Sequence, residues 1–306
     1  MAFATGAGIE SYYVVLNQNG SLPAARAWKP CRLTGNTLNQ TTGEITSDEV
    51  KPGRHAGKSR RGATTAAGEL TAELSYGSHD DLLEAAFCGT WTANVLKTGA
   101  TRRPLAILKR NTDIGVDTIY MGAEVNTVAF TFPLQEKITL SMGVIALSEQ
   151  DYDVTEADSF GAPSSTDFMT TFEGQLLLDG VEFDNATALS LTLNNNMDSI
   201  YSLFQREAYA SRLGIINATG QISAYIEDDS MRAKYRTEEE LKMQIRATDK
   251  ETGGNAYQFV MNAVRLTSSS QSGSGSDPLI QQFDFRANFD TSKGADSEII
   301  LTRIPV

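Results

Sequence analysis

The chain has 306 residues, of which 41% are hydrophobic and 21% are charged, and its formal net charge is −12. This composition is typical of a globular protein and excludes a disordered chain, and the negative charge disfavours binding to nucleic acid through phosphate contacts. Residues 1–150 contain equal numbers of acidic and basic side chains, so residues 151–306 carry all of the excess negative charge.

Cysteine and histidine are too scarce for several kinds of chemistry. Cys31, Cys88, His55 and His79 are the only ones, which excludes a disulfide framework and a CxxC zinc site and limits acid–base catalysis. Both histidines are expected to be solvated or capping side chains. No G-x-S-x-G, phosphate-binding loop or HExxH motif occurs. We therefore predict no catalytic residue, no cofactor and no metal site. No apolar run is long enough to span a bilayer, so no membrane partner is expected.

Alternation of apolar and polar residues predicts a mainly β protein. In residues 68–76, Leu70, Ala72 and Leu74 fall on one face of a strand, and Glu69 and Glu73 fall on the other. Similar patterns predict further strands over residues 103–110, 119–132, 138–147, 188–194 and 282–289.

Two short helices interrupt the strands. Residues 78–88 combine an N-cap at Ser78 and acidic residues in the first turn with an apolar stripe and a terminating Gly89. A second short helix is expected over residues 230–236. The acidic residues at both helix starts are interpreted as complementing the helix dipole rather than as a catalytic pair.

Three connecting segments have unusual compositions. Residues 149–167 are acidic and contain Ser, Pro and Gly, which predicts a domain boundary, and residues 268–277 have the composition of a flexible linker. The loop 51–61 is strongly basic. Its expected functional side chains are Lys51, Arg54, His55, Lys58, Arg60 and Arg61. This loop could bind nucleic acid, dock onto an acidic surface of another copy, or have no role; we favour docking because the chain itself supplies the acids.

The two halves of the chain look like copies of one unit. Residues 68–75 match residues 220–227 at an offset of 152, and the segments 104–110 and 240–246 correspond further downstream. The sequence therefore predicts a first β unit over 1–148, an acidic linker over 149–167 and a second β unit over 168–306.

These segments resemble the tail tube proteins of long-tailed bacteriophages, over roughly residues 30–300. The resemblance is carried by strand and turn patterns in residues 33–38, 45–50, 68–87, 172–180, 188–194 and 220–229. It implies two tandem β-sandwich units, each with a short flanking α-helix, that assemble into a closed ring β-barrel. Since family members with one unit form hexameric rings, a chain with two units is expected to form homotrimeric rings that stack into a tube.

The resemblance also implies how such a tube would work. Three chains would give about 24 inner strands, and at about 4.8 Å spacing and about 40° tilt the barrel would be about 48 Å wide, enough for duplex DNA. DNA would pass without specific binding, past the acidic residues Glu69, Glu73, Glu227 and Asp284, which could instead face solvent or a neighbouring subunit. Tape measure, tail terminator and tail tip proteins would be partners.

The expected location is the virion tail, built in the host bacterial cytoplasm, and the absence of a further docking signal favours a non-contractile tail of the siphovirus type. A β-rich binding module, such as a virion decoration or receptor-binding protein, is the alternative function. An enzyme ranks third.

Overall fold

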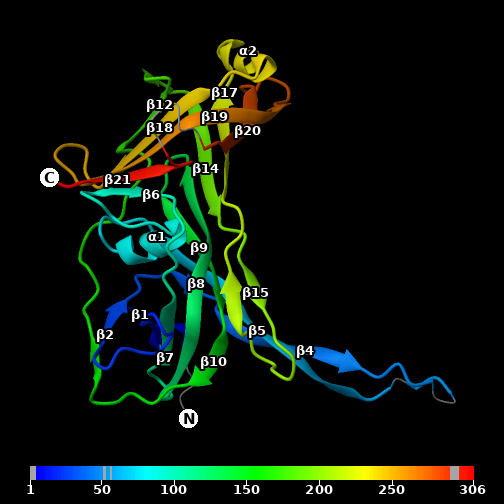
Figure 1. Cartoon of the computed structure of the whole chain (residues 1–306). Coiled ribbons are helices and arrows are strands. Elements are labelled where there is room, and N and C mark those ends of the chain that lie inside the picture. The colour runs from blue at the N-terminus through cyan, green and yellow to red at the C-terminus, as the bar shows by residue number, and fades with distance from the viewer. Residues whose placement is uncertain (1–4, 51–52, 56, 290–295) are drawn as a thin grey trace.

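The computed structural model describes residues 5–50, 53–55, 57–289 and 296–306 as a mainly β protein with two short α-helices (Figure 1). Lys51 of the predicted basic loop lies outside the described residues. Neither of the helices in the described part is long and apolar enough to cross a bilayer.

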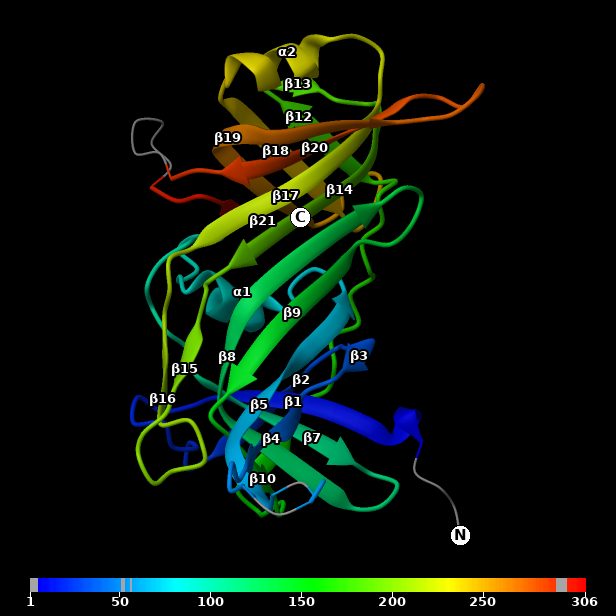
Figure 2. The ribbon, with the colours of Figure 1, turned by 90° about the vertical axis from the view of Figure 1, so that its right-hand side faces the viewer.

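One continuous antiparallel sheet, which we call the central sheet, runs through both halves of the chain (Figure 2). Each of its strands pairs with the one that follows it in the sheet. From one edge to the other, the strands are β4 (Asn39–Thr46), β5 (Ser59–Glu73), β9 (Thr139–Ala146), β8 (Val116–Pro133), β14 (Ala186–Asn194), β17 (Asn217–Tyr225), β20 (Ile280–Ala287) and β19 (Ala256–Ser272). The pairing of β8 with β14 joins the two halves.

The register gives the central sheet one apolar and one polar face, as the alternation predicts. One row across the apolar face consists of Ala72, Leu140, Phe130, Leu191, Gly220, Phe285 and Leu266. The neighbouring row on the polar face consists of Glu73, Thr139, Thr131, Ser190, Gln221, Asp284 and Ser268. Side chains of the first row are largely buried, so the hydrophobic effect fixes which face is covered.

A second, smaller hydrophobic cluster in the first half consists of Val14, Leu16, Trp28, Ala106, Leu108 and Ile119. The main core lies between the apolar face and an outer layer of other strands. In the first half these are β1 (Ile9–Val15), β2 (Arg26–Pro30), β7 (Leu105–Asn111), β10 (Ser148–Asp151) and β11 (Asp158–Phe160). In the second half they are β12 (Gly174–Leu178), β13 (Val181–Glu182), β18 (Leu241–Thr248) and β21 (Ile300–Ile304). The short β3 (Gly35–Asn36) pairs with β5, and β6 (Val95–Lys97) pairs with β21, which brings the C-terminal strand against the first half.

The two longest strands each belong to both layers. The first part of β8 pairs with β7, and its second part pairs with β9. In the same way, β19 pairs with β18 up to Val264 and continues beside β20 to Ser272. A shift of register marks each crossing, between Val125 and Thr127 in β8 and between Leu266 and Ser268 in β19. Such bulges bend a strand and allow it to leave one sheet for another.

Helices α1 (Asp80–Phe87) and α2 (Ser230–Thr237) occupy the predicted places, but the first boundary differs. His79, not Ser78, is the N-cap of α1, and Cys88 at φ 48° ends it one residue before Gly89. The expectation of a solvated or capping His79 side chain was wrong. Its ring is fully buried and makes no cap hydrogen bond, and burial lowers the pKa of this imidazole to about 4.

Two of the expected loops are partly strands. The serine run from 268 was expected to be a flexible linker, but Ser268–Ser272 continue β19 because β20 lies alongside and supplies backbone partners. The basic segment was expected to be a loop throughout, yet Ser59, Arg60 and Arg61 belong to β5 and pair with β4. Residues 149–167 pack on the first half: their start lies in β10, and β11 pairs in parallel with β2.

The two halves repeat one order of strand pairing. In the first half, neighbouring strands pair in the order β4, β5, β9, β8, β7 and β1. In the second half, the corresponding order is β14, β17, β20, β19, β18 and β12. A second register shift, between Leu105 and Ile107, also has its counterpart between Leu241 and Met243. Both helices have eight residues and end in a left-handed residue.

Candidate functional site

The longest projection of the molecule is the hairpin of β4 and β5, which we call the arm (residues 39–65). Its described residues extend away from the body at the lower right of Figure 1, and they include Arg54, His55, Lys58, Arg60 and Arg61. Within the described residues, Arg54, Lys58, Arg60 and Arg61 are exposed and form no ion pair, and His55 is also exposed. A cluster of unpaired cations on an extended arm is suited to contact an acidic surface outside its own chain.

A second hairpin occupies the corresponding place in the other half. It consists of β15 (Asp198–Ile200) and β16 (Ala210–Arg212), and it lies beside β5 in Figure 2. The backbone N–H of Thr64 donates to the carbonyl of Arg206 at 2.8 Å, and the Tyr201 hydroxyl donates to the carbonyl of Thr64 at 3.1 Å. This hairpin therefore contacts β5 at Thr64 and Thr65, next to the point where the pairing with β9 ends.

The polar face of the central sheet contains three of the four predicted acidic residues. Glu69 accepts a hydrogen bond from the Ser141 hydroxyl, and Glu73 forms an ion pair with Lys137 at 2.5 Å. Asp284 accepts hydrogen bonds from the Gln221 amide at 2.8 Å and from the Ser268 hydroxyl at 2.5 Å, which lower the pKa of its carboxyl. Glu227 is exposed two residues beyond the end of β17.

Uncharged side chains dominate this polar face. The rows between the acids consist mainly of Ser, Thr, Asn and Gln, and Arg265 and Arg286 lie opposite each other on the last two strands. Lys137 balances the charge of Glu73, and Glu240 balances that of Arg265 at 3.3 Å, which leaves Glu69, Asp284 and Arg286. The result is a wide surface of hydroxyl and amide groups with little net charge.

Both outer edges of the central sheet are unpaired among the described residues. The strand β4 has β5 as its one partner, and the end of β19 from Arg265 onward has β20 as its one partner. Asn39, residues 41–46 and residues 270–272 are exposed. Edges of this kind carry unpaired N–H and C=O groups and readily accept another strand.

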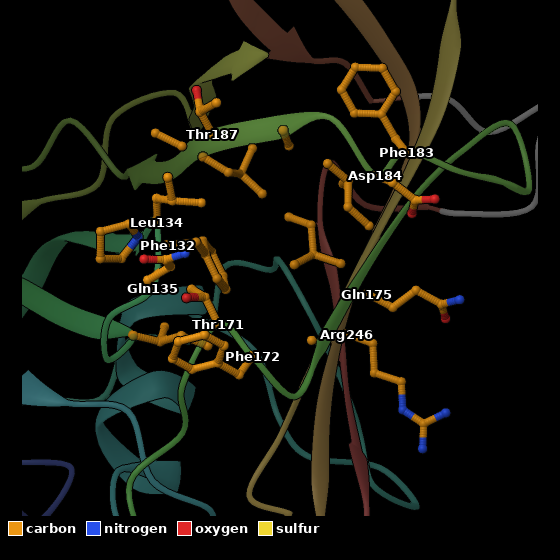
Figure 3. Close-up of a pocket in the computed structure, with 18 of the residues that line it drawn as sticks. Phe132, Leu134, Gln135, Thr171, Phe172, Gln175, Phe183, Asp184, Thr187 and Arg246 are labelled. Atoms are coloured by element: carbon orange, nitrogen blue, oxygen red, sulfur yellow. The ribbon is translucent and has the colours of Figure 1, made fainter. Parts of the chain in front are cut away.

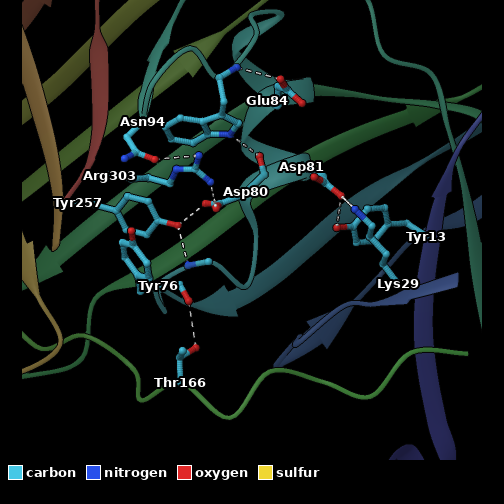
Figure 4. A network of polar contacts seen from close by, with 12 residues as sticks. Tyr13, Lys29, Tyr76, Asp80, Asp81, Glu84, Asn94, Thr166, Tyr257 and Arg303 are labelled. Atoms are coloured by element: carbon cyan, nitrogen blue, oxygen red, sulfur yellow. Dashed lines mark hydrogen bonds and ion pairs between the residues drawn. The ribbon is translucent and has the colours of Figure 1, made fainter. Parts of the chain in front are cut away.

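Polar contacts around α1 join the two halves (Figure 4). Asp80 accepts hydrogen bonds from the Tyr257 hydroxyl and, at 2.5 Å, from Arg303. The Arg303 guanidinium also lies 4.2 Å from the ring centre of Trp91. Burial, and then the charge of Asp80, raise the pKa of Tyr257 well above its ordinary value. These residues connect β19 and β21 to the first turn of α1, so the acid at that helix start has a structural role.

A second joint lies at the loop between β6 and β7. The guanidinium of Arg102 donates two hydrogen bonds of 2.8 Å to Glu124, which is 3% exposed, and the Ser211 hydroxyl also donates to Glu124. Because Ser211 belongs to β16, this buried carboxylate fixes the second hairpin against the first half.

A pocket of about 420 Å³ lies where the two halves meet (Figure 3). Phe132, Phe172 and Phe183 contribute aromatic rings, whereas Gln175 and Arg246 point away from its centre. Among the described residues, no group of three or more His, Cys, Asp and Glu side chains could hold a metal ion.

Large exposed edges, a projecting arm and a polar sheet face describe a subunit built for association. A family model described as phage tail tube protein matches residues 4–287. The chain belongs to the phage tail tube protein family. The comparison with curated proteins gave no match. Like its family, this protein is a structural component of the phage tail, where it self-assembles into the tube, a role consistent with a conduit for DNA ejection.

Sequence reasoning missed two features of this tail tube protein. It did not identify the sheet edges at Asn39–Thr46 and at residues 268–272, because these polar segments show no alternation of apolar and polar residues. It also assigned Asp80 only to the helix dipole, because its partners Tyr257 and Arg303 lie more than 170 residues away.

Proposed function

We propose that three copies of this tail tube protein close into a ring, and that stacked rings form the tube. The observation that carries this proposal is the central sheet, which in the described part of the chain has eight strands and two open edges. Three such sheets would give about 24 strands and a barrel about 48 Å wide, which admits duplex DNA. Closure would also pair every edge, as it does in other barrels.

The repeated strand pairing supports the proposal that the halves are copies of one unit. The first unit would comprise residues 1–148 and the second residues 168–306, joined by residues 149–167. Matching register shifts at Val125 and Leu266 strengthen this correspondence, because a bulge is a specific feature of a strand pair. A ring of three chains would then have pseudo-sixfold symmetry.

The polar face of the central sheet would line the lumen, because the opposite face is already covered by the outer strands and helices. Glu69, Glu73 and Asp284 would then lie in the wall, with Glu227 near its rim. DNA carries one negative charge per about 1.7 Å, so a basic wall would hold it through many phosphate contacts. A wall of hydroxyl and amide groups with few charges offers no such binding, and DNA passes along it.

The arm would contact the neighbouring ring through Arg54, His55, Lys58, Arg60 and Arg61, together with Lys51. The excess of acidic residues in the second half of the chain supplies a complementary surface. Tape measure, tail terminator and tail tip proteins would be the other partners, in a non-contractile virion tail assembled in the host bacterial cytoplasm. The subunit's role would be structural and not catalytic.

The test of this function is the mass and shape of the assembled protein. Size-exclusion chromatography with light scattering, followed by electron microscopy, should show rings of three chains with a central hole, and stacks of such rings. Compact monomers, or rings of six chains, would contradict the trimeric ring.

A further inference from the structure

The junction between the two halves shows how the sheets of two units join by strand pairing, and we call such a junction a seam. There β8 of the first half pairs with β14 of the second, and the register places Thr127 opposite Asn194, Ala129 opposite Thr192 and Thr131 opposite Ser190. All of these side chains lie on the polar face. If the halves are copies of one unit, a ring must repeat this seam between the second half of one chain and the first half of the next.

The strand pairings identify the residues that correspond to this seam. In the first half, Val125 of β8 pairs with Val144, which in turn pairs with Gly68. In the second half, Leu266 of β19 pairs with Phe285, which in turn pairs with Gly220. The register shift directly follows Val125 and Leu266. The segment 127–131 of β8 therefore corresponds to residues 268–272 of β19.

The same two glycines identify the corresponding residues on the other strand of the seam. Gly220 pairs with Leu191 of β14, and Gly68 lies against Leu38 so closely that a Cβ would be 2.4 Å from the Leu38 Cα. Leu38 therefore corresponds to Leu191, and Asn39 and Thr41 correspond to Thr192 and Asn194. Both of these β4 positions belong to the unpaired edge.

We propose that residues 268–272 of β19 pair with residues 37–41 of a second copy of this chain, with Asn39 opposite Ser270 and Thr41 opposite Ser268. The proposal rests on the trimeric ring and specifies its interface. Strand directions fit, because an even number of antiparallel strands makes up the central sheet, so that β19 meets β4 antiparallel. The side chains brought together are small and polar, and cross-strand Ser, Thr and Asn pairs form hydrogen bonds without crowding.

Gln40 gives a further observation at this edge. Its Oε1 atom is buried and has no hydrogen-bond partner in the described part of the chain. In the proposed register Gln40 faces Ser269 of the neighbouring copy. Ser269 accepts a hydrogen bond from the Gln281 amide at 2.9 Å, which leaves its own O–H to donate. Because this oxygen is buried within its own chain, it meets that donor when the Gln40 side chain turns outward to the edge.

Disulfide cross-linking tests the register. In a chain with Cys31 replaced by Ser, the pairs Asn39→Cys with Ser270→Cys and Thr41→Cys with Ser268→Cys should link neighbouring chains of assembled rings under mild oxidation. Denaturing gels should then show dimers and trimers and no larger species. The pair Asn39→Cys with Ser269→Cys has its two thiols on opposite faces and should not link.

The chain also offers a positive control, because Ala129→Cys with Thr192→Cys places the same geometry within one molecule and should form an intrachain disulfide. Rings that assemble but link only in the Asn39–Ser269 pair would overturn the register. If the intrachain control forms but rings link neither through Asn39→Cys with Ser270→Cys nor through Thr41→Cys with Ser268→Cys, the proposed strand pairing is wrong while the ring itself stands. A wild-type protein that forms no rings would contradict the proposed function itself.

Discussion

Gly68 and Gly220 occupy the same position in the two halves of the central sheet, and in both places a neighbouring strand leaves no room for a side chain. A Cβ on Gly68 would lie 2.4 Å from the Cα of Leu38. A Cβ on Gly220 would lie 2.2 Å from the carbonyl oxygen of Ser190 and 2.3 Å from the Phe285 ring. Close approach of backbones, and not a turn, explains why glycine stands at both positions.

Substituting either glycine with alanine should therefore destabilise the protein. We expect Gly68→Ala and Gly220→Ala each to reduce the free energy of unfolding by about 1–3 kcal/mol, because backbone atoms must move to admit the methyl group. Gly6→Ala is the matched control, since a Cβ there meets no atom within 4 Å. Urea denaturation of the three variants measures the effect, and equal midpoints for all of them would refute this account.

The contact of Tyr257 with Asp80 should contribute measurably to the joint between the halves. Tyr257 is fully buried, and its hydroxyl donates to a carboxylate that Arg303 also holds. Tyr257→Phe removes that donor and should cost about 2 kcal/mol of stability, in the range of hydrogen bonds to charged groups.

Tyr225→Phe serves as the comparison for this tyrosine, because the Tyr225 ring is partly exposed and its hydroxyl has no side-chain partner in the described residues. Thermal unfolding should show a clearly lower midpoint for Tyr257→Phe than for Tyr225→Phe. If the two variants unfold together, the hydrogen bond to Asp80 does not stabilise the joint.

Asp158 should make stability depend on pH in the acidic range. Burial alone would raise the pKa of this carboxyl, but hydrogen bonds from Tyr152, Thr155 and Trp28 outweigh burial and lower the pKa to about 2 from 3.8. The Asp158 carboxyl thus binds a proton more readily in the unfolded chain than in the folded one. Its contribution to folding stability is therefore present above about pH 3.8 and is lost as pH falls towards 2.

Denaturant unfolding at several pH values tests this linkage. Asp158→Asn should be less stable than the wild type at pH 6, and the difference should shrink as pH falls from 3.8 towards 2. Asp153→Asn, which replaces an exposed carboxylate a few residues away, should show no such effect. A constant difference between wild type and Asp158→Asn over this pH range would contradict the proposed cause.

The sequence predicts local structure better than strand partners, and particular residues show why. Alternation at Leu189, Leu191 and Leu193 predicts β14 and its buried face correctly, because burial acts on each strand separately. The same pattern contains no information that β14 pairs with β8, because Thr192 and Ala129 are compatible with many neighbours. The pairing is decided by the packing of the whole core.

The missed and misplaced features have the same origin. Serines 268–270 and Ser272 favour a loop by composition, yet β20 holds them in a strand. His79 lies next to a helix start, where a solvated ring is expected, and is instead fully buried. The arm was recognised by its charge, whereas its length depended on the unpredicted pairing of β4 with β5.

The arm's cations should be required for stacking and not for ring formation. Replacing Arg54, Lys58, Arg60 and Arg61 by Glu puts like charges against the acidic surface of the next ring, so we expect single rings and no tubes. The variant with Arg54, Arg60 and Arg61 replaced by Lys retains the charge and should still form tubes. Electron microscopy distinguishes the two. Tubes of normal length from the Glu variant would show that the arm does not join rings.

Lysines introduced on the polar face of the central sheet test whether that face lines the lumen. Thr131 of β8 and Thr219 of β17 lie on it. Tubes of Thr131→Lys with Thr219→Lys should bind short duplex DNA at low salt and release it as salt rises, because phosphate contacts displace counterions. Gln175→Lys with Val181→Lys adds the same charge to the outer layer, where it should leave binding inside the tube unchanged. Electron microscopy of the tubes should show density in the lumen for the first variant alone. DNA that coats the outside of the Thr131 and Thr219 variant would place the polar face on the tube's exterior.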